Sequence, residues 1–265
     1  MRGLAKLARV LALVAVAAFV LAPLAQAVLL SFVATLPHDG VAQGSFSMIN
    51  YRHIFDDPRL VASLGNSIIY VSVNVALTLA VSLPAAYALS RYRFLGDRHL
   101  LLLLLSFRIM PPVVLSLPVF LLFAQINLLN TPLAIALVHC LFNIPVAIWI
   151  LESFITAVPR DFDENAFLDG YSVPGFFVRH LVPMIAPGIG VAAFFCFIFS
   201  WVEVVFARIL TSTGGKPVTM AIEGLFGFRT DVGLVMAMTV FSLLPGLVLI
   251  VFVRRHIARG FRIRV

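Results

Sequence analysis

Ionisable residues stand inside long apolar runs of this sequence, and they are the first candidates for chemistry. Arg108 lies about eight residues into one such run, so a helix would carry it roughly 12 Å deep at 1.5 Å per residue. His139 and Glu203 interrupt two other runs. A charged side chain at the centre of a bilayer is costly and usually lines a solute path or has a partner. These residues point to a polar path, provided that the apolar runs span a membrane.

The composition supports a membrane protein. Of the 265 residues, 62% are hydrophobic and 12% are charged, whereas about a quarter of the residues of a soluble domain are charged. The net charge of +7 comes from short basic clusters beside apolar runs, without a nucleic-acid-binding motif. The two cysteines, Cys140 and Cys196, lie inside apolar runs and indicate no disulfide framework.

Six stretches approach the roughly 20 apolar residues that a helix needs to cross the hydrocarbon core. They lie near 10–32, 64–89, 100–124, 132–153, 187–210 and 232–253. The sequence therefore predicts an all-α integral membrane protein with six transmembrane helices. We expect residues 1–63 to form an N-terminal transmembrane helix and an outer loop, and residues 64–265 to form a core of five transmembrane helices.

Lysine and arginine are distributed unevenly between the segments that join these spans. With the N-terminus inside, the inner segments hold thirteen of them and the outer segments hold four. Basic residues concentrate on the cytoplasmic side of membrane proteins. We therefore expect both termini, and the loop between the fourth and fifth spans, in the cytoplasm.

Polar residues at a depth similar to that of Arg108 extend the candidate path. Asn74, His139 and Asn143 either line this path or make hydrogen bonds between helices. Arg108 itself has two alternatives. It forms a polar wall of the path, or it is a buried arginine bonded to carbonyl groups that Pro111 and Pro112 leave free.

Other kinds of site are less well supported. His139 and Cys140 are adjacent, but neighbouring helical residues point about 100° apart and no partner pair has ligand spacing, so we expect no metal site. No nucleophile and base stand at a plausible spacing for an intramembrane enzyme. A secondary transporter, which would show inverted halves and midplane ion ligands, stays a less favoured alternative.

The longest polar interruption of the chain is the segment 161–188, between the fourth and fifth predicted spans. Residues 160–188 hold four acids and two bases in a basic chain. Asp161, with Glu164 three residues later, gives a capping-box pattern that starts a helix, which we expect to end near Leu168. Gly170 suits a left-handed residue beyond the helix end. A short acidic helix of this kind suits docking to another protein better than contact with anionic lipid.

The motif Glu164, Asn165 and Ala166, followed by Gly170 and Pro183, resembles the EAA loop of permease subunits of binding-protein-dependent ABC importers. Asn165 stands where this family usually has alanine. In the family, the first short helix of the loop is the coupling helix, which sits in a groove of the ATPase subunit. The resemblance implies a coupling loop at about 155–188, with the contacts made by Asp161, Asp163, Glu164, Asn165, Ala166, Asp169, Gly170 and Pro183.

Other segments resemble the maltose-type sugar and polyol permeases of the same family. They include 109–112, 128–131, 143–145 and 258–260, so the resemblance runs from about Asn66 to Gly260. Trp201 and Glu203 match a Trp-Asn-Glu segment that is frequent in carbohydrate permeases, with Val202 in place of the asparagine. The candidate substrate path therefore consists of Asn74, Arg108, His139, Asn143, Trp201 and Glu203.

This resemblance implies a permease subunit in a bacterial inner membrane that carries no catalytic residue and binds no cofactor. The sequence holds no Walker motif, so ATP and Mg²⁺ are expected on a partner ATPase. The implied partners are a second homologous permease subunit, two ATPase subunits and an extracytoplasmic solute-binding protein, without nucleic acid. The implied solute is a sugar, a sugar alcohol or a glycerol-like compound, and an amino acid, peptide or phosphate ester is the alternative.

Overall fold

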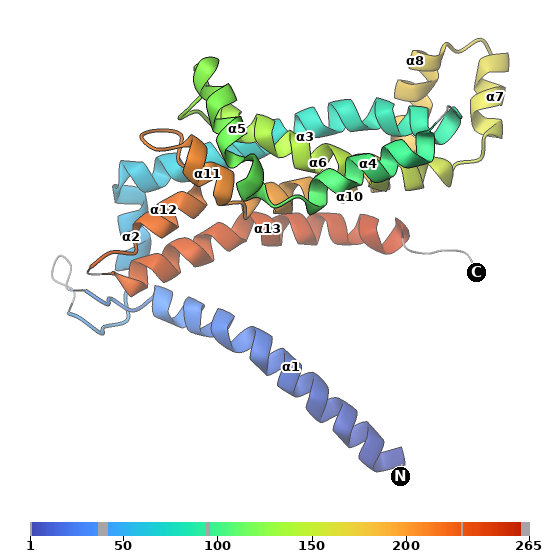
Figure 1. Ribbon diagram of the computed structural model, residues 1–265. Helices are drawn as coiled ribbons and strands as arrows, with labels where there is room; N and C mark the ends of the chain where they lie inside the picture. Colours follow the sequence, from blue (N-terminus) through green and yellow to red (C-terminus); the bar gives the residue numbers. More distant parts are fainter. Residues whose placement is uncertain (1, 37–41, 94–95, 229, 261–265) are drawn as a thin grey trace. The chain divides into compact units, whose positions relative to one another are not determined.

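We describe a computed structural model of the chain over residues 2–36, 42–93, 96–228 and 230–260. These residues form α-helices (Figure 1), one short π-helix and an isolated antiparallel bridge between Val33 and Phe46. The predicted all-α fold is confirmed. Arg229, Arg262 and Arg264, which contributed to the expected orientation, lie outside the described residues.

Several helices are long and apolar enough to cross a membrane. In the described part of the chain, four single helices meet this condition by length and composition. They are α1 (Arg2–Ser31), α3 (Pro58–Arg91), α6 (Pro132–Thr156) and α13 (Val232–Gly260).

Two further pairs of helices are each long and apolar enough for a span only when the two helices are taken together, and each pair is sharply bent. Helices α4 (Asp97–Ile109) and α5 (Pro112–Gln125) meet at 92°, and the segment Val173–Met184 meets α10 (Ala186–Trp201) at 77°. The described residues therefore contain four to six candidate spans. The prediction of one continuous helix over 100–124 is wrong.

The bend between α4 and α5 follows from two consecutive prolines. A residue before proline is pushed out of the helical region, and both Met110 and Pro111 have extended backbone angles. Pro112 can then begin a new helix, because the first position needs no backbone N–H donor. The apolar run continues through this point, which is why hydropathy alone predicted a single span.

The predicted span 187–210 is also interrupted. Helix α10 has 16 residues, about 24 Å at 1.5 Å per residue, and ends at Trp201. The chain leaves the helix over 202–204 and resumes as the six-residue α11 (Val205–Leu210). The break contains neither proline nor glycine, so its cause lies in side-chain contacts.

The contacts divide the chain into two compact units, which we treat separately. The first groups Met1–Ala62 with Ala221–Leu244, so it joins the N-terminal part to a late segment that the sequence had placed in the core. Here α2 (Ile49–Asp56) is fixed by Asn50, whose side-chain amide donates to the carbonyls of Ser31 and Val33, both at 2.9 Å. Asp231, just before α13, accepts a hydrogen bond from the Thr35 hydroxyl at 2.6 Å.

The second unit consists of Ser63–Met220 with Pro245–Val265. Its central helix is α6, which packs against both α4 and α10, as Figure 1 shows. In the most apolar 18-residue window of α6, 61% of the residues are buried, against 28% or less in the other three single spans. One core cluster of this unit contains Ala86, Tyr87, Ala147, Ile148, Leu151, Ile155, Phe176, Leu181, Ile185, Ala192 and Cys196.

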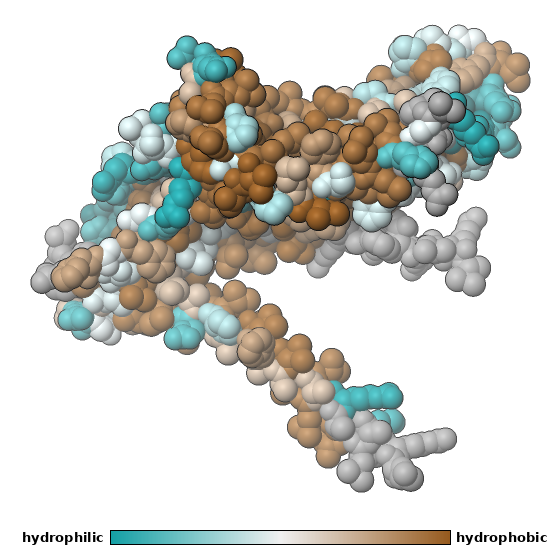
Figure 2. Space-filling model, in the orientation of Figure 1, coloured by the Kyte–Doolittle hydropathy of each residue, from teal (hydrophilic) through white to brown (hydrophobic). Residues whose placement is uncertain are grey.

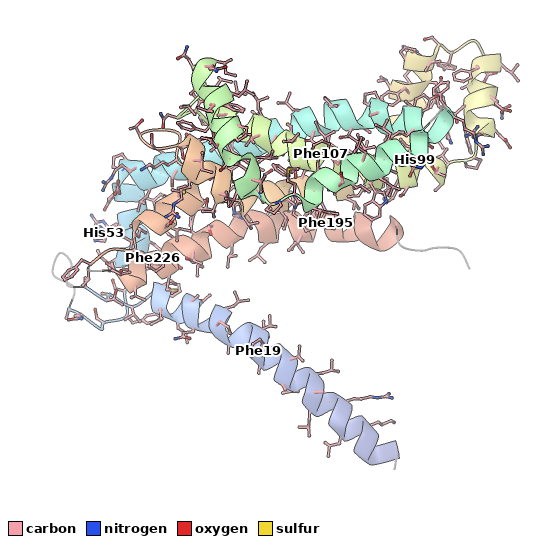
Figure 3. The ribbon with its side chains drawn as sticks, in the orientation of Figure 1. Phe19, His53, His99, Phe107, Phe195 and Phe226 are labelled. Carbon is pink, nitrogen blue, oxygen red and sulfur yellow. The ribbon has the colours of Figure 1, made fainter. Side chains whose placement is uncertain are left out.

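Apolar surface remains exposed on both units. In the first unit, none of the most apolar window of α1 is buried, and Figure 2 shows the helix brown over most of its length. Figure 3 shows Phe19 standing out from this helix, with 83% of its surface exposed. In the second unit, the surface of the long helices is mostly brown and the region of α7 is mostly teal (Figure 2). This distribution suits a lipid environment for the long helices.

Helix α10 approaches α6 closely at Gly188. A Cβ atom on Gly188 would lie 2.7 Å from Cδ2 of Phe154, whereas a Cβ on Gly190 would meet nothing within 4 Å. We expect Gly188→Ala to lower the stability by about 1–3 kcal/mol through overpacking. Gly190→Ala is the matched control, and it should be neutral or stabilise by up to about 1 kcal/mol through helix propensity. Thermal unfolding in detergent measures both, and an equal effect of the two variants would contradict the expectation.

Candidate functional site

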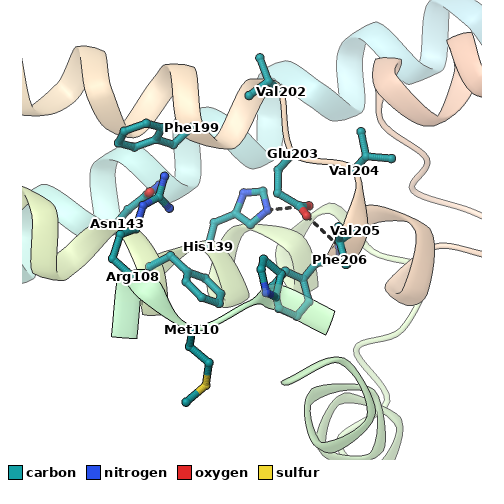
Figure 4. A pocket seen from close by; sticks show the side chains of 12 residues that line it. Arg108, Met110, His139, Asn143, Phe199, Val202, Glu203, Val204, Val205 and Phe206 are labelled. Carbon is teal, nitrogen blue, oxygen red and sulfur yellow. Dashed lines mark hydrogen bonds and ion pairs between the residues drawn. The ribbon is translucent and has the colours of Figure 1, made fainter. Parts of the chain in front are cut away.

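A pocket in the second unit opens where two helices are interrupted. Its volume is about 510 Å³, and both the α4–α5 bend and the α10–α11 break contribute to its wall (Figure 4). Interrupted helices supply polar groups at membrane depth only where they border a cavity or other protein. The lining residues are Arg108, Met110, Pro112, His139, Phe142, Asn143, Phe199, Val202, Glu203, Val204, Val205 and Phe206.

Glu203 explains why the chain leaves the helix at this point. Its carboxylate accepts the backbone N–H groups of Phe206 at 2.9 Å and Ala207 at 3.3 Å, and so satisfies donors at the start of α11. The same carboxylate lies 3.1 Å from Nε2 of His139 on α6, an interaction drawn as a dashed line in Figure 4. The side chain therefore both begins α11 and ties it to α6.

His139 is held in a buried position beside this break. Its ring is 3% exposed and meets the ring of Tyr70 on α3 edge to face, with the centroids 5.7 Å apart. Nδ1 has no hydrogen-bond partner among the described residues. The pair with Glu203 is a hydrogen bond when the imidazole is neutral and an ion pair when it is protonated.

Arg108 lies on the opposite side of the pocket, in the last turn of α4. Its guanidinium carbon is 4.0 Å from the centroid of the Phe199 ring, and Figure 4 shows the two side chains facing each other. Cation–π contacts of this kind stabilise an arginine without neutralising it. No carboxylate of the described residues lies within ion-pair distance of Arg108, so its charge stays available to the pocket.

A buried hydrogen-bond network lies next to the pocket. The Asn143 amide donates to Oδ1 of Asn74 at 2.7 Å and to the Ser200 hydroxyl at 2.9 Å, and Ser200 donates to the same Oδ1 at 3.0 Å. These residues lie on α6, α3 and α10, so the network joins three helices. For Asn74, which does not line the pocket, the structure shows the interhelical alternative.

The candidate path residues are thus only partly brought together. Arg108, His139, Asn143 and Glu203 line one pocket, whereas Trp201 is buried and stacks on Phe197 at 5.3 Å. Phe199 was not among the predicted path residues. Its position four residues before Glu203, near the end of an apolar run, was the available signal.

A helix is present where the coupling helix was predicted, as α7 (Asp161–Leu168), and Gly170 has a φ of +86° as expected. The predicted capping box is wrong. Asp161 is already inside the first turn, the N-cap position belongs to Arg160, and no side chain of the described residues caps the helix. The exposed acids of this turn, Asp161 and Glu164, therefore stabilise the helix through its dipole.

The residues of the predicted coupling loop differ in exposure. Asp161, Glu164, Asn165, Asp169, Gly170 and Pro183 are exposed and Ala166 is half-buried, but Asp163 is only 5% exposed. The apolar side chain of Leu168 is 85% exposed at the end of α7. After Gly170 the chain forms α8 (Val173–Phe176), a π-helix (Phe177–Leu181) and α9 (Val182–Met184), which contains Pro183.

Long apolar helices, a polar pocket at two helix breaks and a short exposed helix between spans define a multi-pass membrane permease. Comparison with known proteins agrees. The pattern of the family described as "Binding-protein-dependent transport system inner membrane component" matches residues 78–263. The chain belongs to this family and is an inner-membrane permease subunit rather than an enzyme.

Individual relatives cover most of the chain. A probable ABC transporter permease, y4oR of Sinorhizobium fredii, is 34% identical over 71% of this chain and 66% of its own length. The sulfoquinovosyl glycerol permease SmoH of Agrobacterium fabrum is 31% identical over 81% of this chain and 76% of its own length. The trehalose permease SugB of Mycobacterium tuberculosis is 31% identical over 80% of this chain and 78% of its own length. The resemblance to sugar permeases is therefore confirmed.

Solved structures share the fold. One is a chain of a bacterial ABC transporter that imports the acidic polysaccharide alginate, with a TM-score of 0.77, 19% identity and coverage of 94% of this chain and 95% of that chain. Another, from the alginate transporter in complex with its pentasaccharide-bound periplasmic protein, has a TM-score of 0.64 and 14% identity, and the match covers 82% of this chain and 84% of that chain. At these identities the likeness concerns the fold alone.

Proposed function

We propose that this chain forms part of the translocation path of an ATP-driven importer for a sugar, sugar alcohol or glycerol-like solute, and that α7 couples it to a separate ATPase subunit. The observation that carries the proposal is the pocket at the two helix breaks. It combines one uncompensated guanidinium, an amide, an imidazole–carboxylate pair and three phenylalanine rings. Hydroxyl-rich solutes are recognised by such polar groups together with flat apolar faces.

The solute class is supported by the relatives. Two of the relatives named above are permeases for sulfoquinovosyl glycerol and trehalose, and a third, GgtD of Synechocystis, is an osmoprotective-compound permease with 29% identity over 81% of this chain. Both sugar moieties and glycerol moieties thus occur among the solutes of similar permeases. The pocket volume of about 510 Å³ also lies within the range of pockets that hold small molecules.

Coupling is proposed to take place at α7. The helix has eight residues, three acids in its first turn and exposed apolar side chains at Phe162 and Leu168, which suits insertion into a groove of an ATPase subunit. We further propose a second permease subunit, two ATPase subunits and an extracytoplasmic binding protein as partners. Both termini would then lie in the cytoplasm. ATP and Mg²⁺ would be bound by the ATPase subunits.

Transport would then proceed by alternating access. The binding of ATP favours one conformation of the ATPase pair, and a helix docked on that pair shifts the permease toward its outward-open state by the difference in affinity. An amino acid, peptide or phosphate ester is the alternative solute class. The aromatic side chains of the pocket favour sugars over this alternative class, because sugar rings present apolar C–H faces that pack on aromatic rings.

Reconstitution tests the proposal. The chain is co-expressed with its partner permease, ATPase and binding protein, and the complex is placed in liposomes. Binding-protein-dependent ATP hydrolysis is then measured with trehalose, a sugar alcohol, glycerol 3-phosphate and glutamine as probes. We expect at least tenfold stimulation by a sugar or polyol. Stimulation only by glycerol 3-phosphate or glutamine would overturn the solute class, and uptake by this chain without ATPase would overturn the importer assignment.

A further inference from the structure

One acid of α7 faces the inside of the protein. Asp161 and Glu164 in the same turn are exposed, but Asp163 is buried against the end of α3. All three were expected to contact an ATPase subunit. A carboxylate buried in its own chain serves a different purpose, because it cannot meet a partner without leaving its site.

Asp163 is bound by two residues of α3. Its Oδ2 lies 2.8 Å from a terminal nitrogen of Arg91, and both side chains of this ion pair are less than one-tenth exposed. The Tyr87 hydroxyl, one turn earlier on α3, donates to Oδ1 at 3.2 Å. Arg91 also donates to the backbone carbonyl of Val158 at 3.1 Å, so it holds both α7 and the segment that precedes it.

Weaker contacts surround this pair. The Arg160 guanidinium donates to the Ser90 carbonyl at 3.2 Å, and the Ser90 hydroxyl lies 2.9 Å from that of Thr156 at the end of α6. These contacts are exposed and therefore contribute little. The buried pair is different, because removing one partner would leave an uncompensated charge inside the protein. Asp163 and Arg91 thus form a buried ionic link between α7 and α3.

The same helix reaches the pocket. Arg91 and Tyr70 lie 21 residues apart on α3, about 31 Å at 1.5 Å per residue. At the pocket end, the Tyr70 hydroxyl donates to the Ser200 carbonyl of α10 at 2.9 Å, and its ring contacts His139. Helix α3 therefore runs as one helix from the site of Asp163 to residues around the helix breaks, and Pro84 is the one position between Tyr70 and Arg91 that cannot donate a backbone hydrogen bond.

We propose that Asp163, Arg91 and Tyr87 form the joint that transmits movement of α7 to α3 and so to the pocket. This inference rests on the proposed coupling of α7 to an ATPase. It divides the acids of the loop into two groups. The exposed ones are free to contact the partner, and Asp163 is a positioning residue that carries the movement into the membrane.

The joint is tested without knowledge of the solute. Val202→Cys places a thiol on the exposed wall of the pocket, and its labelling rate by a maleimide is measured in the assembled complex, with and without MgATP and vanadate. The complex without this substitution corrects for labelling of Cys140 and Cys196. We expect nucleotide to change the rate at least fivefold. Asp163→Asn should reduce the change to less than twofold while ATP hydrolysis continues.

Asp56→Asn is the control, because it removes an exposed acid that lies outside α7, at the end of α2, and should keep the nucleotide response. Tyr87→Phe removes only the 3.2 Å hydrogen bond and should give an intermediate response. A normal response of Asp163→Asn would overturn the joint. No response in the parent complex, with ATP hydrolysis intact, would instead overturn the proposed coupling through α7.

If the Asp163→Asn complex does not assemble, a second variant is tested. The charge-swapped pair Arg91→Asp with Asp163→Arg is then expected to recover the assembled complex and at least half of the nucleotide response. Recovery of assembly without the response would show that the pair serves stability alone, and would overturn the inference. Failure of the swapped pair to recover assembly would overturn it as well.

Discussion

Gly170→Val is expected to lower the amount of ATPase subunit that co-purifies with this chain at least tenfold, with normal insertion in the membrane. Gly170 has a φ of +86°, where a β-branched residue is strained by roughly 1–3 kcal/mol. The turn at this position sets the direction in which the chain leaves α7. Relief of the strain would rotate α7 relative to the segment that follows it, and its exposed face would no longer fit a groove.

Gly44→Val provides the matched control. Gly44 has a φ of +84°, and a Cβ atom at either glycine would meet nothing within 4 Å, so both substitutions introduce similar backbone strain. Gly44 lies far from α7 in the sequence, in the loop between α1 and α2. Equal loss of ATPase in the two variants would assign the effect to general destabilisation and contradict a special role of the turn after α7.

A change of charge on the exposed face of α7 tests ATPase binding independently of backbone strain. Glu164→Lys leaves the backbone unchanged but reverses a charge in the first turn, where the helix dipole favours an acid. It should weaken ATPase binding without affecting membrane insertion. Co-purification at the level of the unmodified chain, for both Gly170→Val and Glu164→Lys, would exclude α7 as the coupling helix.

Arg108→Ala is expected to reduce ATP-driven uptake at least tenfold in a complex that still assembles. The guanidinium packs over Phe199 and has no carboxylate partner among the described residues, so little of the fold depends on its charge. A solute that enters the pocket would no longer receive charge-assisted hydrogen bonds from the guanidinium of Arg108. The loss of transport is measured as uptake in liposomes, with the sugar probe that stimulates the complex. The assembly of the complex is measured as the amount of co-purified ATPase.

Arg52→Ala is the control for Arg108. Arg52 lies on the surface of α2 and pairs with Asp56 at 3.5 Å, with both side chains exposed, so its removal should leave uptake unchanged. Arg108→Lys keeps the charge but loses the flat guanidinium over the ring, and we expect an intermediate rate. Normal uptake by Arg108→Ala would assign this residue to packing against Phe199.

Local sequence features determined much of the architecture. The hydropathy of the runs predicted an all-α membrane fold, and local sequence signals predicted a short helix that ends near Leu168 and a left-handed residue at Gly170. The family followed from the EAA-like loop. These features depend on the solvation of the helix and on the backbone preferences of single residues, so they can be read without knowledge of the neighbours in space.

Two features of the membrane part could be anticipated only in part. Pro111 and Pro112 indicated a disturbed helix, but hydropathy averages over direction and cannot distinguish a straight span from two helices that meet at 92°. The break after Trp201 carries no such signal. It depends on the Glu203 carboxylate, which satisfies the donors of α11 and meets His139, a residue 64 positions earlier in the chain.

Tertiary structure alone decided which polar residues face a pocket and which face another helix. Asn74 and Asn143 look alike in the sequence, yet only Asn143 lines the pocket, and Asp163 is buried beside exposed acids of the same turn. Long-range packing sets these differences, because a polar group removed from water must find its partners wherever the neighbouring helices bring them. The sequence by itself determined the class of protein and the place of α7. The positions of Arg108, Glu203 and Asp163 relative to their partners arose only from helices that meet in space.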